Sequence, residues 1–237
     1  MNAKIYAVRV SFRMFVKQIA GDAMLAVVFA APFLTGSVFR FLVPFLAERF
    51  AFTPRIAPFY QLFDVFLCIL TPYMCCFASA MIMLGELDDH VTSAFFVSPL
   101  GRDGYLVSRL FIPTLIGAAG TVLIFSLFHL TPASLGTRVT LALLTACSAC
   151  ISALLTVAFA RNRVEGMALA KLSGVMMLGA LVPYVLNGRA SLYFAFLPSL
   201  WISRFMQSGH VSDALACLAV SAVWMSALYR SFMRRWR

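Results

Sequence analysis

The chain alternates between long apolar stretches and short polar ones over almost its whole length. Six apolar stretches have about the twenty residues that a helix needs to cross a bilayer. They are continuous and do not alternate with polar residues, which favours helices over a β-barrel. The pattern predicts an all-α polytopic membrane protein, one transmembrane domain over residues 1–237, with spans at 23–47, 58–84, 105–130, 139–160, 167–187 and 211–230.

The stretch before the first span has a different pattern, in which apolar residues recur at helical spacing beside a basic stripe of Arg9, Arg13 and Lys17. The apolar positions are Ile5, Val8, Phe12, Phe15, Val16 and Ile19. We expect residues 1–21 to form an amphipathic helix in the membrane interface, with its apolar face toward lipid. The basic residues also fit a simple topology signal. No cleavable signal peptide is expected, because the first apolar run begins late and is too long.

The polar segments predict the orientation of the spans. An even number of spans places both termini on one side, and both termini are rich in Lys and Arg, so both are expected in the cytoplasm. The same rule places 85–104 and 161–166 in the cytoplasm. The remaining segments, 48–57, 131–138 and 188–210, then face outward.

One outward segment, 188–210, contains an apolar stretch that is too short to cross a bilayer and that includes Pro198. Such stretches are typically interfacial or re-entrant. We expect this one to cap the outer side between spans five and six, with Tyr193 and Trp201 at headgroup depth.

The most polar island between two spans runs from Gly85 to Arg109. It holds four of the nine acidic residues, Glu86, Asp88, Asp89 and Asp103, followed by an apolar turn and Ser98-Pro99. An island of this kind between membrane helices must lie in water, and its composition indicates a docking element.

Composition agrees with the membrane assignment and argues against nucleic-acid binding and against a metal site. Hydrophobic residues make up 62% of the chain and charged residues only 12%, far from the soluble average. The net charge of +10 arises from termini and short loops, so no nucleic-acid partner is expected. Cys147 and Cys150 form a CxxC, but like the other cysteines (Cys68, Cys75, Cys76 and Cys217) they lie in apolar runs. We expect them to be core residues rather than metal ligands, and we expect no metal site.

No catalytic constellation is present in the sequence. The three histidines lie far apart, and no nucleophile elbow occurs. None of the lysines follows a glycine, so the chain has no P-loop and cannot hydrolyse nucleotide through one. A transport or structural role is favoured over an enzymatic one.

Two charges lie clearly inside the predicted spans, Arg40 in the first and Asp64 in the second. Each is about seven residues from the outer end of its helix, which is a depth of roughly 10 Å. An ion pair between neighbouring helices is favoured over a contact with substrate.

Two cytoplasmic segments carry a family resemblance. The first reads Glu86-Leu-Asp88-Asp89, then Ala94 to Leu100 with Ser98-Pro99, then Tyr105 to Arg109. The second is Asn162-Arg-Val-Glu165-Gly166 at the start of span five. Together with the amphipathic start and six spans, this order resembles the type-2 ABC-transporter permeases, especially small fluoroquinolone exporters. His90-Val91 departs from the Gly-Thr that the family often has there.

The resemblance implies a permease subunit that pairs with a second copy or a related permease in a bacterial inner membrane. Two separate ATPase subunits would bind ATP and Mg, and this chain would hold no cofactor. An apolar face of Phe95, Phe96 and Leu100 would insert into a groove on the ATPase. The residues implied in ATPase coupling are Glu86, Asp88, Asp89, Phe95, Phe96, Ser98, Pro99, Leu100 and Glu165.

The family's direction is export, and the apolar composition suits a hydrophobic or amphipathic cargo. Two other functions fit the same sequence: a membrane scaffold or assembly protein without a transport path, and an intramembrane enzyme acting on lipid. Association with an ATPase subunit separates the first function from both alternatives.

Overall fold

The computed structural model describes residues 3–50, 57–186 and 188–235. Within them all the regular structure is helical, and six helices are long and apolar enough to cross a membrane. This confirms the predicted fold class. The candidate spans are Ala23–Arg49, Tyr60–Asp88, Gly101–Phe128, Leu135–Phe159, Arg163–Val185 and Val211–Arg234.

Several spans are built from more than one element. The first joins α2 (Ala23–Ser37), the π-helical η1 (Val38–Leu42) and α3 (Val43–Arg49). The third joins α7 (Gly101–Leu106), the π-helical η3 (Val107–Phe111) and α8 (Ile112–Phe128). The others are α5 (Tyr60–Asp88), α9 (Leu135–Phe159), the set α10 (Arg163–Gly174), η4 (Val175–Leu181) and α11 (Val182–Val185), and α13 (Val211–Arg235).

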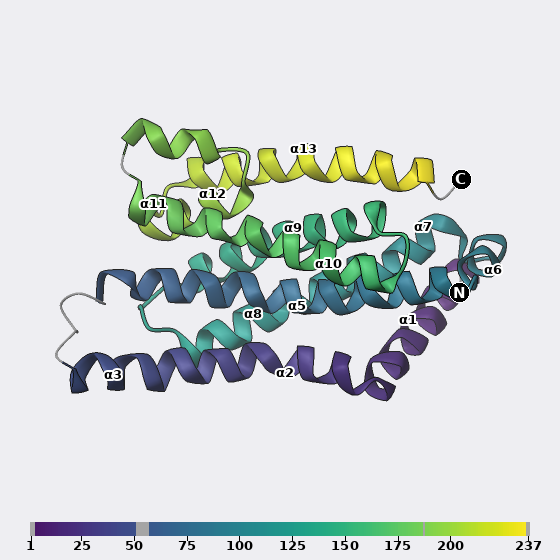
Figure 1. Ribbon diagram of the computed structural model, residues 1–237, viewed down its shortest axis with the longest axis horizontal. Coiled ribbons are helices and arrows are strands. Elements are labelled where there is room, and N and C mark those ends of the chain that lie inside the picture. The colour runs from purple at the N-terminus through teal and green to yellow at the C-terminus, as the bar shows by residue number, and fades with distance from the viewer. Residues whose placement is uncertain (1–2, 51–56, 187, 236–237) are drawn as a thin grey trace.

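Helices α5 and α9 form the centre of the bundle, and the first and last spans lie at its margins (Figure 1). Of the most apolar window in each span, 72% is buried in α5 and 78% in α9, but only 11% in the first span and 22% in the last. Small residues let helices approach closely. A Cβ on Gly117 of α8 would lie 2.8 Å from the Pro72 Cα of α5, so only glycine fits there.

The two π-helical turns share a local sequence, Val-x-Arg-x-x-x-Pro, at 38–44 and 107–113. Proline has no amide hydrogen, so neither Pro44 nor Pro113 can donate to the carbonyl four residues before it, on Arg40 or Arg109. The chain widens at both places, and the amides of Val43 and Ile112 bond five residues back. An arginine therefore sits in each widened turn.

Helix α1 (Ala3–Gly21) meets α2 at Asp22, whose carboxylate accepts from the amides of Met24 and Leu25 and caps α2. The helix forms as predicted, but its apolar face is divided. Phe15 is buried against the protein, whereas Ile5 and Val16 are exposed. The face expected to meet lipid is thus partly occupied by the third span.

The segment after span five folds back on the bundle. Its elements are η5 (Gly188–Phe194) and α12 (Pro198–Ser208). Pro198 does not interrupt a helix but occupies the first turn of α12, where its missing amide hydrogen costs nothing. With 11 residues α12 cannot cross a bilayer. Trp201 Nε1 donates to the Ala195 carbonyl at 2.8 Å and Tyr193 is exposed.

Candidate functional site

The predicted docking segment lies at the end of the bundle that carries both ends of the described chain (Figure 1), which we call the terminal end. After α5, His90 adopts a φ of 56° in the turn that leads to α6 (Thr92–Val97). Ser98 then ends α6, because a residue before proline avoids the helical region. Its hydroxyl donates to the Phe95 carbonyl at 2.6 Å and accepts from the Leu100 amide at 3.3 Å.

A buried ion pair joins α5 to η3 at this end. Glu86 is 5% exposed and Arg109 is fully buried. Arg109 Nε donates to Glu86 Oε2 at 3.1 Å and its Nη2 donates to Oε1, so the pair is bidentate. Tyr105 Oη also donates to Oε2, at 2.9 Å. The Glu86 carboxylate is therefore fully used inside the protein.

The Arg109 guanidinium also contacts α1 and α6. Its Nη1 donates to the Ser11 carbonyl at 2.8 Å. Its Cζ lies 5.7 Å from the ring centroid of Phe15 in α1 and 5.6 Å from that of Phe95 in α6. The hydroxyls of Ser11 and Ser108 are 3.1 Å apart beside it. One arginine thus connects α1, α5 and α6 to the third span.

The structure turns the predicted apolar docking face inward. Leu100 is buried, and Phe95 and Phe96 pack against the buried ring of Tyr105. Helix α6 has only six residues, and these half-buried rings attach it to the bundle. Its exposed side is different: Val97 is 90% exposed, and Pro99 next to it is exposed.

Among the other predicted coupling residues, Asp88 connects two segments of the terminal end. Asp88 Oδ2 accepts from the Arg163 amide at 3.0 Å, at the first residue of α10. Asn162 caps the same helix by accepting from the Glu165 amide at 2.8 Å, and Glu165 accepts from the Arg161 amide at 2.7 Å. Asp89 is exposed. The two segments that carried the resemblance therefore touch each other.

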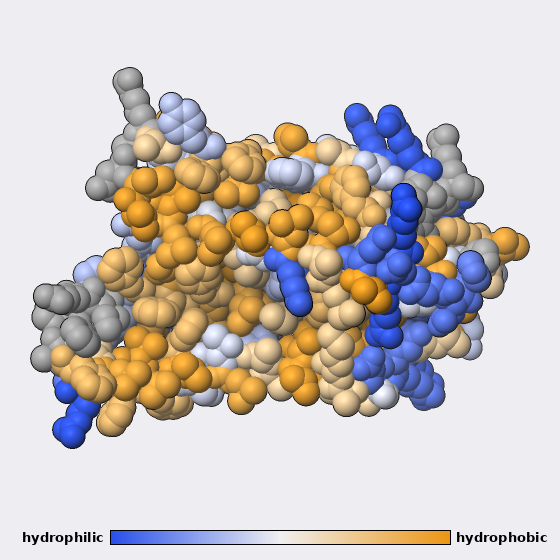
Figure 2. Space-filling view, viewed as in Figure 1, coloured by the Kyte–Doolittle hydropathy of each residue, from blue (hydrophilic) through white to orange (hydrophobic). Residues whose placement is uncertain are grey.

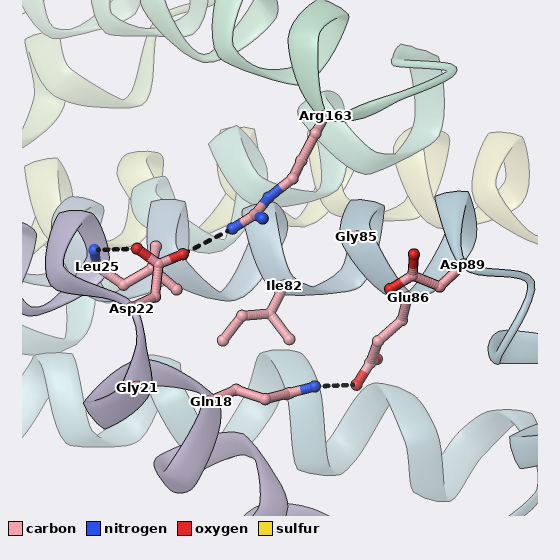
Figure 3. Close-up of a pocket in the computed structure, with 9 residues that line it drawn as sticks. All are labelled: Gln18, Gly21, Asp22, Leu25, Ile82, Gly85, Glu86, Asp89 and Arg163. Carbon is pink, nitrogen blue, oxygen red and sulfur yellow. Dashed lines mark hydrogen bonds and ion pairs between the residues drawn. The ribbon is translucent and has the colours of Figure 1, made fainter.

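A polar cleft of about 230 Å³ opens between α1, α5 and α10 (Figure 3). Arg163 Nη2 bridges it to Asp22 Oδ2 at 3.1 Å. The hydrogen bond from Arg163 is the largest cause that lowers the pKa of Asp22 below its ordinary value of 3.8. Gln18 Nε2 lies 3.5 Å from Glu86 Oε1 on the opposite wall. Of the charged residues that line the cleft, Asp22, Glu86 and Arg163 are paired within the protein, and Asp89 is exposed.

The predicted ion pair between Arg40 and Asp64 is corrected by the structure, which describes both residues. Asp64 is buried and accepts from the amides of Leu130 and Thr131, each at 2.8 Å, and from the Thr131 hydroxyl at 2.5 Å. Arg40 is exposed and its Nη1 donates to the His129 carbonyl at 2.8 Å. The charges share a depth, but each binds the loop after α8 instead of the other.

Arg109 was the functional candidate that the sequence pattern obscured. It stands at the border of a polar island and an apolar run, so it reads as the last residue of a loop motif. The signal that could have found it is the repeated Val-x-Arg-x-x-x-Pro, since the other copy contains the intramembrane Arg40. In the part of the chain that the structure describes, no three His, Cys, Asp or Glu side chains are grouped to hold a metal.

Comparison with known proteins gives independent evidence of the family. A sequence model of the family described as "Fluoroquinolones export permease protein Rv2686c-like" matches residues 15–233. Two similar proteins are the fluoroquinolones export permease proteins MT2760 and Rv2686c of Mycobacterium tuberculosis, from strains CDC 1551 / Oshkosh and ATCC 25618 / H37Rv. Each is 25% identical over 229 residues, covering 89% of this chain and 88% of the relative. No solved structure gives a significant match.

Proposed function

The chain belongs to the family of fluoroquinolone export permeases, and from this we propose that it is the membrane-spanning subunit of an ATP-driven ABC exporter. The observation that carries the proposal is the family match over residues 15–233, which includes five spans, all but the last residue of the sixth, and both segments that carried the resemblance. The relatives are named for fluoroquinolone export. A fluoroquinolone, or another amphipathic compound with a flat aromatic core, is the cargo that we propose.

The energy for export comes from a partner in this proposal. The sequence has no P-loop, so ATP and Mg would be bound by two separate ATPase subunits. A second permease subunit, identical or related, would complete the membrane part. The chain itself would act as a transport subunit and not as an enzyme.

The terminal end is the side on which we place the ATPase, in the cytoplasm. Figure 2 shows hydrophilic residues gathered at this end and a wide apolar band beside them. The segments there contain most of the 19 Lys and Arg residues, and short cytoplasmic segments are enriched in these residues. Both termini would then be cytoplasmic, and α12 would lie at the outer surface.

The side chains that would meet the ATPase are the exposed ones of the predicted set and their neighbours. Val97 at the end of α6 and Pro99 just after it are exposed, and Asp89 is exposed in the turn before α6. Glu86, Phe95, Phe96 and Leu100 would contribute from inside by holding α6 in place. Asp88 would hold the second segment against the first, and Glu165 would fix the turn at the start of the second segment.

Reconstitution tests the proposal. The permease is purified with a candidate ATPase subunit and inserted into vesicles, and ATP-dependent movement of a fluorescent fluoroquinolone is measured. We expect Val97→Asp to weaken ATPase association, because a charge would replace an exposed apolar contact. Val211→Asp is the matched control, since Val211 is 70% exposed at the opposite end and should leave association unchanged.

The outcomes separate the exporter from the alternatives. ATP-dependent transport that Val97→Asp abolishes supports the exporter. A permease that binds no ATPase, with transport of no tested compound, would overturn the proposal.

A further inference from the structure

We propose that Arg109 is a positioning residue that fixes α6 to α1 and to the second and third spans, so that these parts move as one body. The inference rests on the proposed function and names the residue that would transmit movement of an ATPase bound at α6. It arises from the geometry at η3, where one buried guanidinium faces three other elements, α1, α5 and α6.

Each of these contacts uses a different part of the guanidinium. Nε and Nη2 face Glu86 of α5, and Nη1 faces the Ser11 carbonyl of α1. Phe15 of α1 and Phe95 of α6 lie within 6 Å of Cζ. A planar cation with a fixed fork of donors can make all of these contacts at once, and this geometry is specific to arginine.

Burial makes the arrangement resistant to partial opening. Arg109 and Tyr105 are both fully buried, and Glu86 nearly so. Separating the cation from its carboxylate in such a place would leave an unpaired buried charge, which is strongly unfavourable. A displacement of α6 is therefore expected to carry α1 and the adjoining turns of both spans with it.

The local backbone supports the same role. The π-helical turn η3 widens the helix at Arg109 because Pro113 follows four residues later. The widened turn places Ser108 and Arg109 together on the side that faces α1, where the hydroxyls of Ser108 and Ser11 meet. Helix α6, by contrast, has six residues and is held mainly through its aromatic side chains.

Arg109→Lys separates positioning from charge. Lysine keeps the positive charge for Glu86 but has no planar fork to bind Glu86 and Ser11 together. We expect association with the ATPase subunit and basal ATP hydrolysis to persist, while ATP-dependent transport falls about tenfold. The matched control is Arg138→Lys, because Arg138 also binds a backbone carbonyl and packs on a ring, Phe125, but belongs to α9 and the opposite end.

Phe95 provides a second variant that leaves the buried ion pair intact. Phe95→Leu removes the ring that faces Arg109 and keeps apolar volume, so it should raise the amount of ATP hydrolysed per molecule transported. Phe95→Tyr keeps the ring and should restore the wild-type ratio. A general loss of stability would not distinguish leucine from tyrosine in this way.

A distance measurement tests the single body directly. Spin labels at Val91, at the start of α6, and Lys17 of α1 occupy exposed positions. In the wild-type complex their distance should be the same with and without ATP, and in Arg109→Lys it should change when ATP binds. A wild-type distance that changes with ATP, or an Arg109→Lys variant that transports as well as wild type, would overturn the inference. Failure of the wild-type complex to transport would instead count against the proposed function.

Discussion

Each end of the bundle contains an arginine and an acidic residue, but these charges are satisfied by different partners at the two ends. Each end has an arginine in a π-helical turn before a proline and an acidic residue on α5. At the terminal end Arg109 and Glu86 bind each other directly. At the opposite end Arg40 and Asp64 both bind the loop after α8, one through a carbonyl and the other through two amides.

Depth in the membrane does not determine which charges pair. A buried charge needs hydrogen-bonding partners, and a loop with free amides satisfies a carboxylate as well as a cation does. Where a helix such as α6 offers only rings, the cation and the carboxylate must satisfy each other. At the opposite end the hydrogen bonds fix a loop between two spans, whereas at the terminal end the ion pair fixes whole helices to one another.

The largest effect is expected from Arg109→Leu. It leaves Glu86 buried without its cation, and breaking a buried pair in this way costs about 3–5 kcal/mol. The free energy of unfolding in detergent measures the loss. A change below about 1 kcal/mol, typical of a surface pair, would contradict the burial on which the comparison depends.

A smaller but clear effect is expected from Asp64→Leu at the opposite end. The amides of Leu130 and Thr131 lose a charged acceptor, for which about 2–3 kcal/mol is expected. The loop after α8 should also become mobile, which faster hydrogen exchange at residues 130 and 131 would reveal. Exchange unchanged from wild type would show that Asp64 does not hold the loop.

The smallest effect concerns the exposed pair between Asp22 and Arg163. Because the pKa of Asp22 is lowered in the folded protein, its stabilising contribution is complete above the ordinary value of 3.8. The contribution is lost as the pH falls through the lowered folded value. Asp22→Asn keeps a good cap for α2 and removes only the charge.

Stability measured against pH checks this sign. The wild type should exceed Asp22→Asn slightly at neutral pH, and the difference should vanish in acid. A difference that grows as the pH falls would mean that the carboxylate destabilises the fold. Since both side chains are substantially exposed, solvent screening keeps the effect small.

Much of the fold could be predicted from the sequence, because hydrophobic run length alone identifies membrane spans. The residues at which the spans begin and end were harder to predict from the sequence. The third begins at Gly101 rather than 105, since α7 and η3 continue the helix into the polar island. The inward face of α6 was also hidden, because a pattern of rings does not show whether they face a partner or the protein's own Tyr105.

The site was predicted as a region and not in its chemistry. Helical rise gave similar depths for Arg40 and Asp64, but it contains no information on the direction of a side chain around its helix or on a loop that folds between them. The role of Arg109 could not be predicted without the position of α1, which covers it with Phe15 and the Ser11 carbonyl. Such contacts join residues almost a hundred positions apart, beyond the reach of any local pattern.

The most direct test of the contrast between the two ends is a pair of double-mutant cycles in the same detergent. One cycle combines Arg109→Leu with Glu86→Leu, and the other combines Arg40→Leu with Asp64→Leu. We expect the first double variant to recover a large part of the single losses, because it removes both buried charges. The second cycle should show a clearly smaller recovery, because Arg40 and Asp64 do not bind each other and share only the loop after α8. Additive losses at 86 and 109, or a strong recovery at 40 and 64, would contradict this contrast between the two ends.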